Sequence, residues 1–398
     1  MPLALLVARG GAEVFMAVIG LSFLATIAQQ KKWDIVKDPL VGTLFVTWLA
    51  LNILVSPFAG NVGESFGRSL LWLRFIVFFA AVPFWLVRSH DDLTLIMRAW
   101  GIILAFAIID GLVQLATGTS LTGRPMLGNR LTAALDRPNI GIFVVRIGFP
   151  FMAGWLLLIA ARVTDRDLWR VKPSMWGFAC LMVAFVLLTG ERSATLLTLI
   201  ALAAMVLLAT MISVEYRRYG LFGILAAAAA LAAVLLGSAR ILARARSALQ
   251  VIEHFWHSIY GELILAGLRL WREHPLAGVG MDNFRFACRE ILDRGLISEC
   301  HPHPHNMYVE WLAETGMIGF LGFAVFVVIL IWRVLKPLRA DDAHIRLVGT
   351  FLAGCLLVVL LPFSVGQSFF SNWPAMLLWS SLALTAAVAR LACGGEGR

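Results

Sequence analysis

The sequence predicts an all-α membrane protein, a polytopic helical bundle, from its composition and from the spacing of its apolar runs. Hydrophobic residues make up 60% of the 398-residue chain, charged residues make up 14%, and the mean hydropathy is +0.84. A soluble domain has roughly 25% charged residues, and its core could not hide so much apolar surface. The composition therefore excludes a soluble enzyme, a secreted disulfide scaffold, a disordered chain and a protein that binds nucleic acid.

Apolar runs long enough to cross a membrane recur along the whole chain. A helical span needs about 20 mostly apolar residues. Eleven candidate runs lie at 11–28, 40–57, 69–87, 93–116, 139–161, 174–190, 194–213, 220–237, 315–335, 346–363 and 374–392. We expect eleven or twelve spans, the twelfth being a short first span that is folded into residues 1–28 or missing from this start. The chain then divides into N-terminal transmembrane helices (1–237), one large loop (238–314) and C-terminal transmembrane helices (315–398).

The charged residues of the short loops give the orientation. The net charge is +9, and all five lysines fall between apolar runs, at Lys31, Lys32, Lys37, Lys172 and Lys336. Cytoplasmic loops retain lysine and arginine, so the segments 29–39, 162–173, 215–219 and 333–346 are assigned to the cytoplasm. The large loop then lies outside, where every basic residue is arginine. Arginine grips phosphate at two points, which favours an anionic, phosphate-bearing ligand; an arginine-biased composition is the alternative.

The large outer loop contains the longest polar stretch and the elements of a small folded unit. Residues 239–246 can form a basic helix along the membrane surface, and residues 259–273 have helical spacing. Pro275, Gly278 and Gly280 are expected to end that second helix. If this stretch is extracytosolic, Cys288 and Cys300 can form a disulfide.

Three histidines lie within five residues of this loop, in the sequence C-H-P-H-P-H-N at 300–306. The prolines are expected to hold the segment extended, so that the imidazoles of His301, His303 and His305 face one way. Three interpretations stay open: a general base or substrate contact, a metal site, and a polar turn that enters a span. Asn306 is expected to cap a helix that begins near Met307.

Arginines near the outer ends of spans form a second group of candidates. Arg74 and Arg146 lie inside two apolar runs, and Arg192 lies in the tight turn between two others. Charges at membrane depth tend to face a protein or water cavity, which predicts one shared cavity that suits a pyrophosphate. The alternative is that these arginines form ion pairs inside the protein. Asp110 could neutralise Arg74 or Arg146, and Glu191 could pair with a charge close to it.

The remaining polar motif, residues 272–285, has glycines two positions apart that allow a tight turn and a close backbone approach. It does not follow a strand, so it does not indicate nucleotide binding. Four outer tryptophans can either stack on sugar rings or mark the membrane interface, which is the commoner role. They are Trp256, Trp271, Trp311 and Trp373.

Together these motifs resemble the O-antigen ligase/polymerase superfamily. The resemblance rests on P-L-A-G-V-G-M-D-N-F-R at 275–285 and on H-P-H-N-M-Y-V-E-W-L-A-E-T-G-M-I-G at 303–319, which resembles the family's histidine motif running into a span. G-E-R-S-A at 190–194 and D-R-P-N-I at 136–140 resemble two other outer segments of the family. Tyr260 stands where members often carry an arginine.

The resemblance implies an integral-membrane glycosyltransferase of the GT-C kind, inverting, metal-independent and without a cofactor. Its donor would be a glycan on undecaprenyl pyrophosphate, and its acceptor the lipid A-core or a growing glycan. It would work in the bacterial inner membrane with the active site facing the periplasm. By motif position His305 or His303 would be the base, Arg192 would hold the pyrophosphate, and Arg272 or Arg285 could close on it. Asn306, Gly278, Gly280 and Gly316 would support this site.

Two reactions of the family fit the motifs, and a third function comes from another class. A ligase joins polymerised glycan to the lipid A-core, and we take this as the first expectation. A polymerase joins O-antigen or exopolysaccharide repeat units on the lipid carrier. A transporter of lipid-linked sugars would instead use Arg74, Arg98 and Asp110 to line a path, and it would have no need for the histidine-rich loop.

Overall fold

The computed structural model describes residues 2–161, 168–212, 253–362 and 368–394. In these ranges every major element is a helix, with no strand beyond two isolated β-bridges. The long helices are α2 (Arg9–Gln30), α3 (Pro39–Ala50), α4 (Val62–Ala81), α5 (His90–Thr117), α6 (Ile140–Ala160), α7 (Leu168–Thr189), α8 (Arg192–Ile212), α13 (Met307–Val334), α14 (Ala343–Leu360) and α15 (Asn372–Ala392). The shorter ones are α1 (Pro2–Val7), α11 (Ile259–Glu273) and α12 (Phe284–Asp293).

Nine helices of the described residues are long and apolar enough to cross a membrane. Each coincides with an apolar run of the sequence, and a shorter apolar helix, Gly177–Thr189, coincides with a tenth. The prediction of an all-α polytopic membrane protein is confirmed. The run at 220–237 and the basic segment at 239–246 lie outside the described residues, so the total of eleven or twelve spans stays a prediction.

Polar side chains decide where several helices begin. The carboxylate of Asp38 accepts a hydrogen bond from the Leu40 amide at 3.0 Å and so caps α3, and Asp342 caps α14 in the same way. Ser89 and Asp92 form a reciprocal capping box at the start of α5. These bonds satisfy amides that have no partner within the first turn of a helix.

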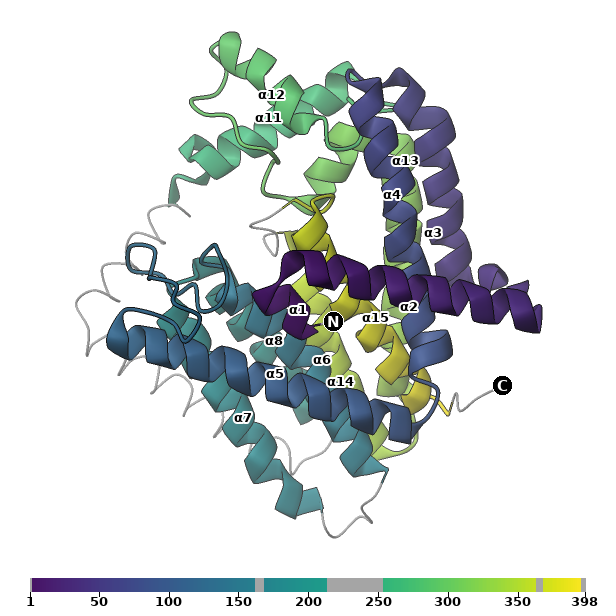
Figure 1. Cartoon of the computed structure of the whole chain (residues 1–398), viewed down its shortest axis with the longest axis vertical. Helices are drawn as coiled ribbons and strands as arrows, with labels where there is room; N and C mark the ends of the chain where they lie inside the picture. The colour runs from purple at the N-terminus through teal and green to yellow at the C-terminus, as the bar shows by residue number, and fades with distance from the viewer. Residues whose placement is uncertain (1, 162–167, 213–252, 363–367, 395–398) are drawn as a thin grey trace.

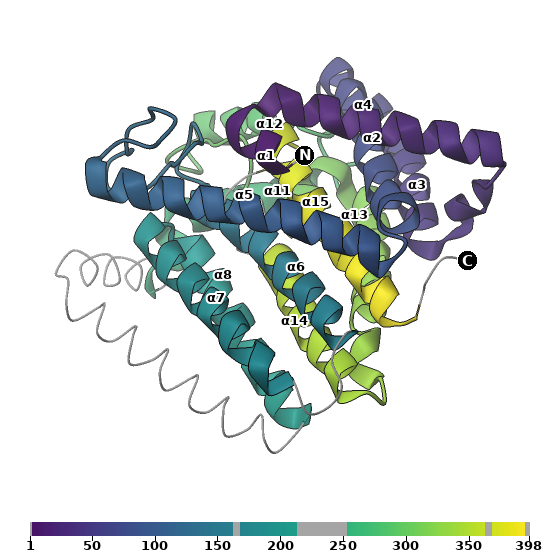
Figure 2. The ribbon, with the colours of Figure 1, turned by 60° about the horizontal axis from the view of Figure 1, so that its bottom comes forward.

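The spans cross one another steeply. Figure 1 shows α2 running across α4, and Figure 2 shows α6, α7 and α14 as a group with α5 laid over one side. Among the candidate spans α15 and α6 are the most buried: 94% and 83% of the residues are buried in the most apolar 18-residue stretch of each. The core therefore forms around these two helices, and the others present more of their apolar surface outward.

The loop helices α11 and α12 lie together at one end of the molecule, beside the ends of α4 and α13 (Figure 1). The sequence placed the first of them at 259–273, which is the range that α11 occupies. Their own small core is formed by Leu263, Leu270, Phe284, Cys288, Ile291 and neighbours. This unit carries most of the motifs of the predicted site.

Two of the four outer tryptophans belong to the interior, so neither interpretation offered by the sequence holds for them. Trp311 has no exposed surface and packs between Trp72 and Phe323, and Trp373 is 6% exposed and donates a hydrogen bond from its indole N–H to the Leu5 carbonyl. They fill the region where α4, α13 and α15 meet. Trp256, by contrast, is exposed.

Candidate active site

A break in α13 holds the turn that follows α11. Gly316 leaves the helical conformation, with φ +59° and ψ −162°. Backbone amides and carbonyls around it would otherwise lack partners, and the turn supplies them. Val279 and Gly280 donate to carbonyls of α13 at 2.9 Å, and the amides of Met317 and Ile318 donate to carbonyls of the turn at 2.9 and 3.1 Å.

The motif glycines are explained by this close contact of backbones. Gly278 (φ +64°) and Gly280 (φ +103°) occupy the left-handed region that side chains disfavour. A Cβ on Gly278 would lie 2.5 Å from the carbonyl carbon of Glu314, and one on Gly316 would overlap the Leu276 carbonyl. The three predicted supporting glycines therefore allow the turn to lie against α13.

Two buried carboxylates of α13 hold the loops on either side of it. Glu314 accepts hydrogen bonds from the Asp282 amide at 2.5 Å and from the Phe284 amide at 3.1 Å, at the start of α12. Glu310, one turn earlier, accepts from the Ser368 hydroxyl and from the amide of the next residue. The sequence motif contained both glutamates, but no role was assigned to them. Their spacing of four residues at the start of an apolar helix is the signal that could have indicated buried, bonded carboxylates.

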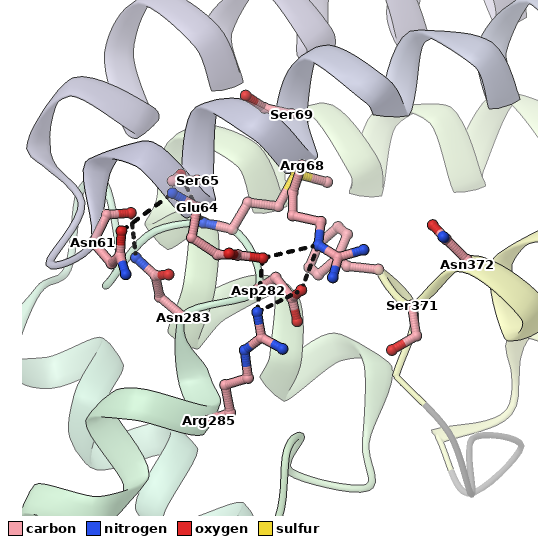
Figure 3. Close-up of polar contacts among 12 residues, drawn as sticks. Asn61, Glu64, Ser65, Arg68, Ser69, Asp282, Asn283, Arg285, Ser371 and Asn372 are labelled. Atoms are coloured by element: carbon pink, nitrogen blue, oxygen red, sulfur yellow. Dashed lines mark hydrogen bonds and ion pairs between the residues drawn. The ribbon is translucent and has the colours of Figure 1, made fainter.

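An ion-pair network fastens the turn to α4 (Figure 3). Arg68 on α4 contacts the Asp282 carboxylate at 2.6 Å and the Glu64 carboxylate at 3.1 Å. Arg285, from the start of α12, contacts Glu64 at 2.7 Å and Asp282 at 3.4 Å. Arg285 was predicted to close on a pyrophosphate, whereas the structure binds it to two carboxylates. Burial raises the pKa of Asp282, and the two guanidinium groups oppose that shift.

Sequence reasoning missed Arg68 and Glu64, because their partners are more than 200 residues away in the chain. Figure 3 also shows Asn61 and Ser65 of the same helix facing the turn. The Met281 amide donates to the Ser65 hydroxyl at 3.0 Å, and the Asn283 side chain donates to the Asn61 carbonyl at 3.1 Å. The turn is therefore fixed to α4 and to α13 at once.

The histidine segment is fixed at both ends. Cys300 is joined to Cys288 of α12 by a disulfide, with their Cα atoms 5.7 Å apart. Ser298 donates from its amide and from its hydroxyl to Glu262 of α11, both at 2.7 Å. At the other end Asn306 accepts from the amides of Tyr308 and Val309, so it caps α13, which begins at Met307 as the sequence predicted.

The segment is not extended throughout, which corrects the sequence prediction. His305 has φ +54°, in the left-handed region, so the chain turns there. The turn still gathers the rings: His305 Nε2 lies 3.2 Å from His301 Nδ1, and the rings of His303 and His305 are 4.3 Å apart. Tyr260 of α11 meets the ring of His305 edge-on at 5.3 Å. Such strain in a non-glycine residue persists where the surroundings impose it, and it is common at functional sites.

His305 has the chemistry of a neutral proton acceptor. Burial, and then the neighbouring His301, lower the pKa of His305 from 6.5 to about 4. Its Nδ1 atom is buried and makes no hydrogen bond. Among the described residues no three His, Cys, Asp or Glu side chains are placed to hold a metal ion together. The buried Nδ1 atom without a hydrogen-bond partner favours the interpretation of this segment as a base or a substrate contact.

The predicted arginines lie in different surroundings. Arg146 of α6 is 2% exposed, Arg192 is exposed at the first residue of α8, and Arg272 is exposed in the last turn of α11. Arg74 of α4 donates to the side chain of Asn372 at 2.5 Å. A cavity shared by Arg74, Arg146 and Arg192 stays a prediction.

The structure gives Arg74 and Asp110 other partners than each other, so it does not support the alternative that these two residues pair. Asp110 accepts from the Leu121 amide at 2.6 Å and so holds the loop that follows α5. Glu191, beside Arg192, accepts from the amides of Gly141 and Ile142 at 2.5 and 3.1 Å. Both carboxylates accept hydrogen bonds from backbone amides. Glu191 thereby fixes the turn before α8 to the start of α6.

A match to a family model covers the part of the chain that holds the turn, the disulfide and the histidine segment. Residues 177–324 match the model described as O-antigen ligase. The chain contains an O-antigen ligase domain. The resemblance drawn from the motifs to the O-antigen ligase/polymerase superfamily is thereby confirmed. A search of curated proteins finds no match.

The O-antigen ligase domain begins in α7 and ends in α13. It includes Arg192, the disulfide, the docked turn and the histidine segment, whereas Arg68, Arg74 and Arg146 lie before it. Members of this family catalyse glycosyl transfer in a general sense. With its apolar helices, the chain is a multi-pass membrane protein that contains an O-antigen ligase domain.

Proposed function

We propose that this protein is a glycosyltransferase that moves a glycan from undecaprenyl pyrophosphate to the lipid A-core, as an O-antigen ligase. The observation that carries the proposal is the position of His305 within the O-antigen ligase domain, with a buried Nδ1 atom that has no hydrogen-bond partner. A ring nitrogen in this state can accept the proton of an acceptor hydroxyl.

The reaction is a single displacement that inverts the anomeric carbon. The acceptor hydroxyl gives its proton to His305 Nδ1 while its oxygen forms a bond to the anomeric carbon. The bond from that carbon to the pyrophosphate breaks, and the pyrophosphate leaves with the electron pair. Arg192 is exposed at the first residue of α8, and we propose that it holds the pyrophosphate. A guanidinium binds phosphate at two points and neutralises the charge that develops on it.

The active site is proposed to face the periplasm of the bacterial inner membrane. The disulfide between Cys288 and Cys300 supports this side, because disulfides persist in oxidising compartments and are rare in the cytoplasm. The lysine-containing loops 29–39 and 333–346 support it too, since they lie at the other ends of the spans in the predicted topology.

The test is the lipopolysaccharide profile of a strain that lacks the gene. We expect lipid A-core without glycan together with accumulated carrier-linked polymer, and restoration by the wild-type protein. His305→Ala should not restore the ladder, whereas His274→Ala, an exposed histidine of the same loop, should restore it at equal membrane levels. Core that carries a single repeat unit would indicate a polymerase instead. An unchanged ladder in the deletion strain would contradict both reactions and favour an exopolysaccharide substrate or a transporter.

A further inference from the structure

A glutamate and a second histidine stand in line behind His305. Glu299 Oε1 lies 3.1 Å from His301 Nε2, and His301 Nδ1 lies 3.2 Å from His305 Nε2. Both distances are hydrogen-bond distances. The line ends at His305 Nδ1, the buried atom that has no hydrogen-bond partner.

The carboxylate at the outer end decides where the protons sit along this line. A carboxylate accepts hydrogen bonds and donates none, and a neutral imidazole carries one N–H. The bond to Glu299 therefore requires the proton of His301 on Nε2, which leaves its Nδ1 as an acceptor. His305 must then donate from Nε2, and its lone pair is left on Nδ1.

The opposite set of tautomers is unfavourable for a simple reason. If His305 carried its proton on Nδ1, His301 would have to donate from Nδ1, and its Nε2 lone pair would face the carboxylate of Glu299. Two acceptors would then oppose each other at 3.1 Å. Neither could then donate to the other, so the hydrogen bond between Glu299 and His301 would be lost.

We propose that Glu299 and His301 are positioning residues that hold His305 in the tautomer whose Nδ1 lone pair is free to accept the proton of the acceptor hydroxyl. This inference rests on the proposed function and adds two residues to it. After the proton arrives, His305 is an imidazolium whose Nε2–H still points at His301 Nδ1, and the negative charge of Glu299 opposes the new positive charge through the intervening ring. The proton leaves Nδ1 for water once the product has gone.

The disulfide helps to hold Glu299 and His301 in place. Cys300 lies between Glu299 and His301, and its bond to Cys288 fixes the segment to α12. The carboxylate of Glu299 is 68% exposed and the ring of His301 is 33% exposed. The line therefore runs from solvent inward to the buried ring nitrogen, so the outer residue can be changed without disturbing a core.

The first measurement is the tautomer itself, in the full-length protein in detergent with ¹⁵N-labelled histidine. The His305 signals are assigned by their loss in His305→Ala. We expect His305 Nδ1 to be unprotonated and Nε2 protonated at pH 8. In Glu299→Gln we expect a mixture of the two tautomers, because the glutamine amide can accept or donate. A protonated Nδ1 in the wild-type protein would overturn the proposal, whatever its activity.

The second measurement is glycan transfer by the purified protein from an undecaprenyl-pyrophosphate-linked glycan. Glu299→Gln should lower kcat about tenfold, which is part of the about 10²–10⁴-fold that a positioned general base contributes, with KM unchanged. Glu299→Asp, which keeps the carboxylate, should recover part of the loss. Glu290→Gln is the matched control, since this glutamate of the same loop has a side chain that is 74% exposed. Equal kcat values for wild type and Glu299→Gln would overturn the positioning role. A wild-type protein without transfer would instead overturn the proposed function, while the tautomer measurement would still decide the arrangement of the rings.

Discussion

The carboxylate of Glu314 accepts a hydrogen bond from the backbone amide of Asp282, and the carboxylate of Asp282 in turn contacts Arg68 on α4. Glu314 therefore fixes the turn to α13, and Asp282 fixes the same turn to α4. Glu314 also accepts from the first amide of α12. The loop unit that carries the histidine segment is oriented by this chain of contacts.

Glu314→Ala should therefore loosen the turn. Two buried backbone amides would lose their acceptor, at about 1–3 kcal/mol each, so we expect a loss of about 2–6 kcal/mol in stability, seen as a lower Tm in detergent. Glu314→Gln should lose less, because its amide oxygen still accepts a hydrogen bond. An unchanged Tm for the alanine variant would show that the turn is held without this carboxylate.

Gly316→Ala tests the close approach of the turn to α13. Both Gly316 and Gly295 have positive φ, but a Cβ at Gly316 would overlap the Leu276 carbonyl, whereas a Cβ at Gly295 would meet nothing within 4 Å. We expect Gly295→Ala to cost about 1 kcal/mol from its backbone conformation. Gly316→Ala should cost clearly more or prevent folding. Thermal denaturation of the pair separates the two effects, and equal losses would contradict the packing.

Breaking the ion-pair network should free one end of the loop unit. Arg68→Ala removes the closest partner of the Asp282 carboxylate, which is 7% exposed. Because this carboxylate is buried and the arginine is partly exposed, we expect a destabilisation of about 1–3 kcal/mol. Arg294→Ala removes a more exposed pair, with Glu273, and should cost less than about 1 kcal/mol. The comparison is made by limited proteolysis of the loop, and equal cleavage rates for both variants would count against the network.

The low pKa of His305 predicts an unusual pH dependence. The titratable side chains that face its ring are His301, His303 and Tyr260. With a folded pKa of about 4 against 6.5 for the free side chain, the unfolded chain binds more protons here between these two values. The contribution of this group to stability is therefore full above about pH 6.5 and is lost as the pH falls towards 4. Transfer should persist down to about pH 5, whereas a kcat/KM profile with its midpoint near 6.5 would contradict the buried, neutral base.

The disulfide can be tested by thiol labelling of the solubilised protein. Cys393, free and exposed at the end of α15, serves as the positive control, whereas Cys288 and Cys300 should label only after reduction. Replacing both bonded cysteines by serine should cost about 3 kcal/mol, because the unfolded chain regains the conformational freedom that the bond removes. Labelling of Cys288 without a reductant would remove both the bond and its support for a periplasmic site.

The sequence predicted most of the fold because membrane spans are encoded locally. Apolar length alone located the nine candidate spans, and helical spacing with a following proline located α11. The cap at Asn306 was also predictable, since an asparagine before an apolar helix has one common role.

The rest depends on partners far apart in the chain. The side chain of Arg285 is suited to binding phosphate, so the sequence suggested that role. Its carboxylate partner Glu64 lies 221 residues earlier, where the sequence gives no sign of the pairing. The break in α13 at Gly316 is explained only by the turn that begins at Pro275, which packs against it and bonds its backbone. The left-handed turn at His305 could not be foreseen either, because the proline pattern of the segment favours an extended chain.

The most direct test of the central claim is glycan transfer by the purified protein in lipid vesicles. The donor is an undecaprenyl-pyrophosphate-linked polymer, and the acceptors are lipid A-core or, separately, the same carrier-linked glycan. We predict that the wild-type protein and His274→Ala attach glycan to lipid A-core, and that His305→Ala does not although it folds and inserts equally. Transfer by His305→Ala at the wild-type rate would contradict the account.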